Sequence, residues 1–165
     1  MRYVSLLSFL LVFAACSPKY YRTGDYSFYD QKFSLPDTAL LRKDGVYVSD
    51  SMAYVFYKGG QSNLVLTPGN HLQAIAERHR QQRPTLFEGY YRVQGRQLVI
   101  QSVNNARRQF YYTYALLSPD SLTVVRQTIK GKRRFKEKYF TSSYKAHYLF
   151  MPLDTAVLNR YKPYW

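Results

Sequence analysis

Hydrophobic and polar residues alternate with the period of two typical of β-strands along most of the chain after residue 44. The clearest example is the stretch 86–103, LFEGYYRVQGRQLVIQSV, in which Gly95 and Arg96 separate two alternating segments. Glycine at the first central position suits a type II′ hairpin turn, because that position needs a positive φ. The cross-strand partners are then Gln94 with Gln97, Val93 with Leu98, and Tyr91 with Ile100. The apolar pairs fall on one face, so the sequence predicts a hairpin of defined register.

The same pattern predicts further short strands, most of them separated by Gly-rich or Ser-Pro-Asp turns. Including the hairpin, the expected strands are 44–48, 52–57, 62–67, 86–94, 97–103, 109–117, 122–129, 134–141 and 144–151. Between the third and fourth strands the period changes, with Leu72, Ile75, Ala76 and His79 at helical spacing. This spacing predicts one short helix that starts near Asn70 and ends before Pro84, and a helical turn is expected at 153–160.

Consecutive antiparallel strands avoid exposed edges by closing into a barrel or by stacking as two sheets. We therefore predict a mainly β fold, an antiparallel up-and-down barrel or flattened barrel of about eight strands with one short helix. The predicted organisation is a signal peptide at 1–15, a tether at 16–43, a β-barrel domain at 44–151 and a C-terminal tail at 152–165.

The first residues have the features of a secretory signal, with Arg2 followed by an apolar block and then small residues. The segment resembles a bacterial lipoprotein signal, with Phe13-Ala14-Ala15-Cys16 at the lipobox position. This resemblance implies cleavage before Cys16, a diacylglycerol on its sulfur and acylation of the new amino terminus. No acidic run follows Ser17, which favours an outer-membrane lipoprotein on the periplasmic face. The alternative is an ordinary export signal with a chance cysteine.

Residues 16–43 are polar and tyrosine-rich without a sustained period of either kind, so we expect a tether. Its aromatic residues are too numerous for a plain solvated linker. Part of the segment is therefore expected to lie on the domain or on the membrane surface.

The strand and turn pattern resembles the small lipocalin-like β-barrel lipoproteins of diderm bacteria. The resemblance covers roughly residues 44–150 and rests on Gly-x-Tyr at 45–47, Gly-Tyr-Tyr-Arg-Val-x-Gly at 89–95, Leu-Val-Ile at 98–100 and Ser-Pro-Asp-Ser-Leu-Thr-Val at 118–124. It implies a fold and carries no catalytic signature. Tyr47 stands where lipocalins proper have a tryptophan.

The tyrosines of the predicted strands are candidates for lining a ligand cavity, because a small barrel either fills with side chains or holds one small ligand. The candidates are Tyr47, Tyr91, Tyr112 and Tyr114. As plain core residues they would each need only a hydrogen-bond partner.

The chain is strongly basic, with 24 Lys and Arg against 10 Asp and Glu. The densest group of cations is Lys130, Lys132, Arg133, Arg134, Lys136 and Lys138, interleaved with Phe135, Tyr139 and Phe140. Cations alternating with aromatic rings are typical of nucleic-acid surfaces, but export argues against that partner. The same chemistry suits lipid head groups, lipopolysaccharide phosphates or acidic glycans. The alternative is a solvated edge hairpin whose charges prevent aggregation.

The sequence shows no established catalytic or metal-binding pattern. The histidines, His71, His79 and His147, lack the spacing of a metal site, and no serine lies in a nucleophile elbow. Glu88 and Glu137 lie within predicted strands, but Glu88 is on the same face as Arg92 and Glu137 lies between Lys136 and Lys138. We therefore predict a protein without a cofactor or metal that is not an enzyme.

Two functions are compatible with these features of the sequence. The first is non-enzymatic binding of a small apolar or amphiphilic ligand, or of an anionic envelope component, by a protein held at the membrane by its lipid anchor. The second is an accessory interaction lipoprotein that docks on an outer-membrane protein complex.

Overall fold

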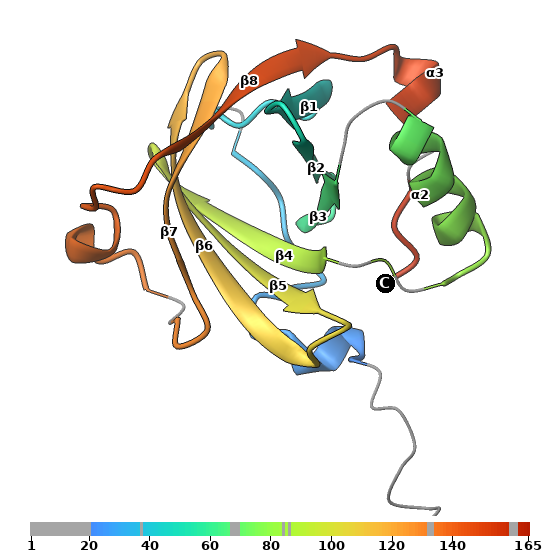
Figure 1. Ribbon diagram of the computed structural model, residues 1–165, viewed down its shortest axis with the longest axis horizontal. Coiled ribbons are helices and arrows are strands. Elements are labelled where there is room, and N and C mark those ends of the chain that lie inside the picture. The colour runs from blue at the N-terminus through green and yellow to red at the C-terminus, as the bar shows by residue number, and fades with distance from the viewer. Residues whose placement is uncertain are drawn as a thin grey trace, which may run out of the picture.

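The chain folds into a closed antiparallel β-barrel in which every strand pairs with its neighbours in sequence order (Figure 1). The computed structural model describes residues 21–36, 38–66, 70–83, 85, 87–131, 134–158 and 162–165. The strands are β1 (Gly45–Val48), β2 (Met52–Phe56), β3 (Gln61–Leu66), β4 (Phe87–Gln94), β5 (Gln97–Asn104), β6 (Gln109–Ser118), β7 (Ser121–Thr128) and β8 (Ala146–Pro152). Pairing of β1 with β8 closes the ring. The predicted mainly β barrel is confirmed.

The β4–β5 hairpin has the predicted register. Gln94 pairs with Gln97, Val93 with Leu98 and Tyr91 with Ile100. Gly95 has a φ of +55°, as the first central residue of a type II′ turn requires, whereas Arg96 keeps a negative φ. Tyr91 and Ile100 both face the barrel interior, so the predicted inner face is also confirmed.

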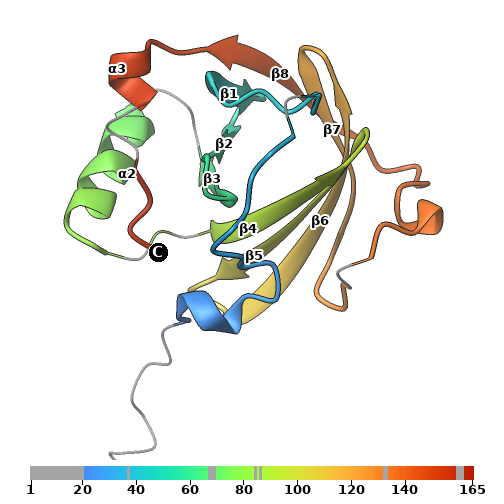
Figure 2. The same ribbon diagram turned by 180° about the vertical axis from the view of Figure 1, so that it is seen from behind.

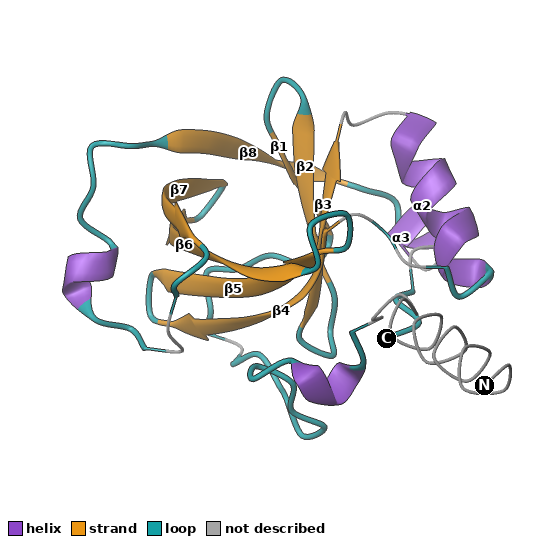
Figure 3. Cartoon of the chain, turned by 60° about the horizontal axis from the view of Figure 1, so that its bottom comes forward, coloured by secondary structure: helices purple, strands orange, loops and turns teal. Residues whose placement is uncertain are grey.

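In the described part of the chain, four short helical segments accompany the strands: η1 (Thr23–Asp25), α2 (Asn70–Arg80), η2 (Glu137–Tyr139) and α3 (Thr155–Leu158). The two α-helices lie on one side of the barrel beside β1–β3, and η2 lies on the opposite side (Figures 1 and 3). The helix predicted from the 3.6-residue period is α2, and α3 falls within the expected terminal helical turn. No helix in the described part of the chain is both long enough and apolar enough to cross a membrane.

Apolar side chains gather in three clusters, one inside the barrel and two on its outer wall. The buried members of the inner cluster are Leu41, Tyr47, Tyr54, Phe56, Tyr91, Leu98, Ile100, Ala115, Leu117, Leu122, Val124 and Tyr148. Those of the first outer cluster are Tyr26, Phe28, Tyr90, Val99, Val103, Tyr114, Val125 and Phe140, and those of the second outer cluster are Val46, Ala53, Val55 and Val65. Strands that are apolar on both faces are therefore covered on both faces.

Much of the segment predicted as a tether is part of the fold. Tyr26 and Phe28 are buried in the first outer cluster, and Leu41 is buried in the inner cluster. Figure 2 shows this blue segment running across the outer wall of β4 and β5 before it enters β1. Its aromatic residues have a partner surface because the sheet beneath them is apolar on its outer face.

The strand predicted at 134–141 is wrong. This segment leaves the sheet after β7 and forms η2, and the chain returns to the barrel only at Ala146. Phe140 packs edge-on against Tyr114 of β6, with ring centroids 5.6 Å apart. The alternation of aromatic and charged residues here reflects a loop that lies on the outer wall with its aromatic side inward.

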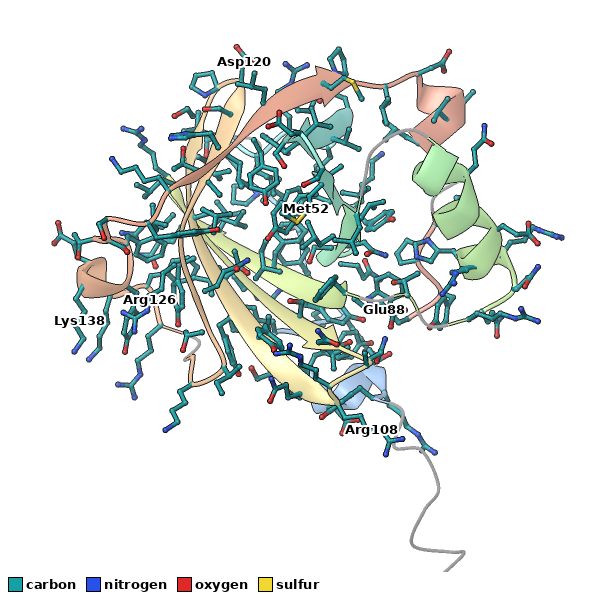
Figure 4. All side chains as sticks on the ribbon, viewed as in Figure 1. Met52, Glu88, Arg108, Asp120, Arg126 and Lys138 are labelled. Atoms are coloured by element: carbon teal, nitrogen blue, oxygen red, sulfur yellow. The ribbon has the colours of Figure 1, made fainter. Side chains whose placement is uncertain are left out.

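The connections between strands lie alternately at the two ends of the barrel, which we call the closed end and the open end. The closed end carries the short connections β2–β3, β4–β5 and β6–β7, and the open end carries the connections β1–β2, β3–β4, β5–β6 and β7–β8. In Figure 4, Asp120 of the β6–β7 turn lies at the top of the molecule, and Arg108 of the β5–β6 turn lies at the bottom.

Candidate functional site: a cavity at the open end

A cavity of about 320 Å³ occupies the open end of the barrel. Side chains from β2–β8 and two of the connections between them line it: Met52, Tyr54, Ser62, Leu64, Leu66, Phe87, Ile100, Ser102, Asn104, Arg107, Tyr111, Thr113, Gln127, Tyr144 and Tyr148. Small-molecule sites in proteins have volumes from about 300 to 1,000 Å³. The cavity is therefore large enough for one small molecule.

The cavity combines apolar walls with a few polar groups that are themselves buried. Met52, Leu64 and Ile100 contribute aliphatic surface, and Met52 projects into the middle of the barrel in Figure 4. Burial raises the pKa of Tyr54 above its usual value, while hydrogen bonds that its hydroxyl oxygen accepts from the Thr113 and Gln127 side chains act in the opposite direction. The phenol is therefore neutral, and the interior suits an apolar body with one or two hydrogen-bonding groups.

The rim differs from the interior because it carries a cation. Arg107 is the one charged residue among the described side chains that line the cavity. Its Nη1 lies 3.4 Å from the Tyr111 hydroxyl, which also accepts a 2.7 Å hydrogen bond from Gln109 Nε2. These hydrogen bonds, that from Gln109 above all, lower the pKa of Tyr111. The rim can therefore receive an acceptor or an anionic group from a ligand.

At the other end of the barrel, the chain itself fills the interior. Phe33 packs edge-on against Tyr91, with ring centroids 5.2 Å apart, and the Arg42 guanidinium lies 3.8 Å from the centre of the Phe150 ring. Arg42 also forms ion pairs with Asp44 at 2.7 Å and Asp120 at 3.2 Å. These contacts close the end opposite the cavity, so the cavity is accessible from the open end alone among the described parts of the barrel.

The four predicted cavity-lining tyrosines do not line this cavity. Tyr47 and Tyr91 face the interior, but they lie in the filled part of the barrel, where Tyr47 accepts a 2.9 Å hydrogen bond from the Arg42 backbone N–H. Tyr91 donates its hydroxyl to the carbonyl of Tyr57 at 3.0 Å. Both act as core residues with one hydrogen-bond partner.

Tyr112 and Tyr114 point out of the barrel, so their assignment to the cavity is corrected. They belong to the first outer cluster, and the inner side of β6 carries Tyr111, Thr113 and Ala115. Their aromatic character is explained by the segments that cover this wall. The sequence contains a signal for the correct orientation, since the pairing of Ile100 with Thr113 turns Thr113 inward once Ile100 is known to be inside.

The predicted basic cluster lies around the β7–β8 connection. Lys130, Arg134, Lys136 and Lys138 are exposed, whereas Lys132 and Arg133 lie outside the described residues. The neighbouring Phe140 is buried against the sheet instead of being presented to solvent. The exposed cations can still attract anionic groups. The predicted lipidation site, Cys16, also lies outside the described residues.

A second group of polar residues, which the sequence did not indicate, is buried outside the barrel beneath α2 and the C-terminal tail. Glu88 is 5% exposed, and its Oε1 accepts hydrogen bonds from the Thr85 backbone N–H, from the Thr85 hydroxyl at 3.1 Å and from the Tyr164 hydroxyl at 3.1 Å. Burial raises the pKa of Glu88 above its usual value. Asn63 donates to Thr85 Oγ1 at 2.9 Å and lies 3.4 Å from His79 Nε2.

The two carboxylates considered in the sequence do not come together in the fold. The exposed Glu137, the other carboxylate considered in the sequence, lies in η2, on the side of the barrel opposite α2. Within the described ranges, no three His, Cys, Asp or Glu side chains come together as they would in a metal site.

Comparison of the chain with protein-family models, with curated proteins and with solved structures finds no match in any of the three.

Proposed function

We propose that this protein is a lipid-anchored component of a bacterial envelope that binds a small amphiphilic molecule inside its barrel without chemical conversion. The cavity at the open end carries this proposal, since it has apolar walls, a few buried hydroxyl groups, and Arg107 at its rim. A ligand with one short apolar chain and a carboxylate or phosphate head matches that arrangement. The exposed cations Lys130, Arg134, Lys136 and Lys138 would favour the approach of such an anion.

Native mass spectrometry of the detergent-purified protein with decanoic acid as the probe tests ligand binding. We expect a complex with one bound decanoate. Leu64→Trp places an indole in the cavity and should reduce the bound fraction by at least about tenfold, a loss of about 1.4 kcal/mol in binding. Leu149→Trp is the matched control, because Leu149 lies on the outer face of β8 and is 66% exposed.

Two results would contradict ligand binding in the barrel. The first is an absence of decanoate complex in the unaltered protein. The second is an equal loss of binding in the Leu64→Trp and Leu149→Trp variants, because the probe would then be bound outside the cavity.

The anchor has a separate test at Cys16, the one cysteine of the chain. We expect Cys16→Ser to abolish labelling with a radioactive fatty acid and to release the protein from the membrane fraction. Labelling and membrane attachment that both persist in the variant would refute the anchor while leaving the cavity untouched.

A second candidate function is docking on a larger membrane complex, and one observation favours it. On the outer face of β8, Leu149 is 66% exposed and Met151 is 38% exposed. Exposed apolar residues that lie next to each other on one strand face are suited to a protein contact. The decanoate experiment separates the two candidates, since a docking protein with an inert cavity would bind no probe.

A further inference from the structure

The N-terminal segment joins the barrel at its open end. The Tyr21 hydroxyl donates a 2.6 Å hydrogen bond to the carbonyl of Arg108, in the β5–β6 connection. The Tyr21 ring also packs edge-on against Phe110, with centroids 4.7 Å apart. Figure 1 shows η1 beside this connection, at the bottom of the barrel. The first described residue of the chain is therefore fixed at the rim of the cavity end.

The distance from this point to the proposed anchor is limited by covalent geometry. Five residue steps separate Cys16 from Tyr21, and a fully extended chain spans at most about 3.6 Å per residue, or roughly 18 Å in all. The closed end lies farther away by about 25 Å along β5. An acyl group on Cys16 would therefore hold the open end, and not the closed end, next to the bilayer.

Charge is distributed unequally between the two ends. Among the described residues, the four connections that begin and end at the open end contain ten Lys and Arg and three acids, Asp50, Glu77 and Glu137. The three connections at the closed end contain two Lys and Arg and one acid, Asp120. Each cation close to an anionic membrane surface adds to the attraction.

Apolar side chains at the open end are exposed between these cations. Leu66 and Tyr144, which both line the cavity, are 45% and 53% exposed, and Ile129 directly after β7 is 53% exposed. Apolar residues beside Lys and Arg are the composition of surfaces that rest in the headgroup region of a bilayer. A tyrosine ring is also suited to that depth.

From these four observations we infer that the open end is a membrane-docking face, which rests on an anionic lipid surface so that the cavity opens directly onto the bilayer. The inference rests on the proposed anchor and cavity, and it adds the source of the ligand. The ligand is a single-chain anionic lipid that passes between bilayer and barrel without crossing water. Arg107 lies where the head of such a lipid would remain at the rim.

A single-label experiment tests this orientation in the acylated protein reconstituted in vesicles of phosphatidylcholine with phosphatidylglycerol. Acylation occupies the one native thiol, so an introduced cysteine is the unique site for a nitroxide. Ala106→Cys places the label in the exposed β5–β6 connection, and Gln94→Cys places it at the exposed closed end as the control. We expect the ratio of oxygen to aqueous nickel accessibility to be at least about threefold higher at 106 than at 94.

A matched pair of triple variants separates charge attraction from tethering. Arg107→Gln, Arg108→Gln and Lys130→Gln together should lower the ratio at 106 at least about twofold. Lys43→Gln, Lys58→Gln and Arg96→Gln remove the same charge elsewhere and should leave it unchanged. Equal ratios at 106 and 94 would overturn the inference, as would a label at 106 shielded from both reagents, which would indicate that a second copy of the chain covers this face.

The outcomes also distinguish this inference from the proposed function. A second reactive thiol per chain would show that Cys16 is not acylated, and the proposed lipid anchor would then be wrong. Decanoate binding in detergent is measured without a bilayer. Decanoate can therefore bind in the cavity even if the labels at 106 and 94 show that the open end does not face the bilayer.

Discussion

His79 is the ionisable side chain whose burial has the clearest consequence for stability. It is 3% exposed, and its ring lies 5.0 Å from the Trp165 ring and 6.1 Å from the Tyr164 ring. Burial lowers the pKa of His79 to about 4. Its Nδ1, Asn63 Oδ1 and Trp165 Nε1 are buried without a hydrogen-bond partner in the described part of the chain, which adds to the cost of any change in charge there.

We predict that His79 makes the fold less stable as the pH falls from about 6.5 towards 4. In that window the unfolded chain binds a proton at this imidazole and the folded chain does not, so acid favours unfolding. Between pH 7 and pH 5 the loss is about 2 kcal/mol. Urea unfolding at both pH values should show this loss in the parent protein, with the His79→Phe variant lacking it.

Two comparisons make the pH experiment specific. His147→Phe, at an exposed position, controls for the loss of an imidazole as such. Glu88 acts in the opposite direction, because its raised pKa favours folding in acid and this contribution is lost as the pH rises above about 4.5. Since Glu88 is present in both proteins, the difference between parent and His79→Phe isolates the histidine. A His79→Phe protein with the parent's pH dependence would contradict the assignment.

At the scale of elements, the sequence predicted the local structures well and the covering segments poorly. Hairpins are specified by residues close together in the chain, and both the Gly95 turn and the Pro119-Asp120 turn occur where expected. The position of Phe28 on the outer wall depends instead on the packing of strands more than 60 residues later. The period of the hydrophobic pattern carries no information about such a contact.

The cavity illustrates the same limit. The register of β4 with β5 and of β5 with β6 determines which side of β6 faces inward. The outer side of β6 is the more aromatic one. A rule that places apolar residues inside therefore fails where a second layer covers the barrel. The cavity itself exists because residues 33–42 fill the interior from one end only, with Phe33 and Leu41 packed against the inner cluster.

We predict that residues 21–43, which the sequence pattern assigns to a tether, contribute strongly to stability. Phe28 is fully buried, its backbone N–H donates a 3.1 Å hydrogen bond to Gln101 Oε1, and its ring lies 6.2 Å from the Tyr112 ring. Phe28→Ala should lower the free energy of unfolding by about 3 to 5 kcal/mol, as expected for a cavity left in a packed core. Urea unfolding at pH 7 measures the change.

Ile129→Ala provides the control for this variant, because Ile129 is 53% exposed and should change stability by no more than about 0.5 kcal/mol. If Phe28→Ala were equally neutral, residues 21–43 would be a detachable tether in solution. The contacts of Phe28 on the outer wall would then contribute nothing measurable to the free energy of unfolding.

On the scale of the whole molecule, the three apolar clusters share one closed sheet. Each strand of the barrel presents one face to the inner cluster, and most present the other face to an outer cluster. The C-terminal tail is tied to the same sheet, because Gln61 Nε2 of β3 donates a 3.0 Å hydrogen bond to the Trp165 carbonyl. Loss of the sheet removes the support of every covering segment, so we expect a single cooperative unfolding transition.

Trp165 is a natural probe of this cooperativity, since it is the one tryptophan of the chain and lies outside the barrel beside His79. Its fluorescence and the far-UV circular dichroism of the strands should change at the same urea concentration. Leu117→Ala, at a fully buried position of the inner cluster, should cost about 2 to 5 kcal/mol and shift both signals equally. A fluorescence transition that precedes the dichroism, or that stays in place in Leu117→Ala, would show that α2 and the tail detach on their own. The part of the outer wall covered by α2 and the tail would then unfold independently of the barrel interior.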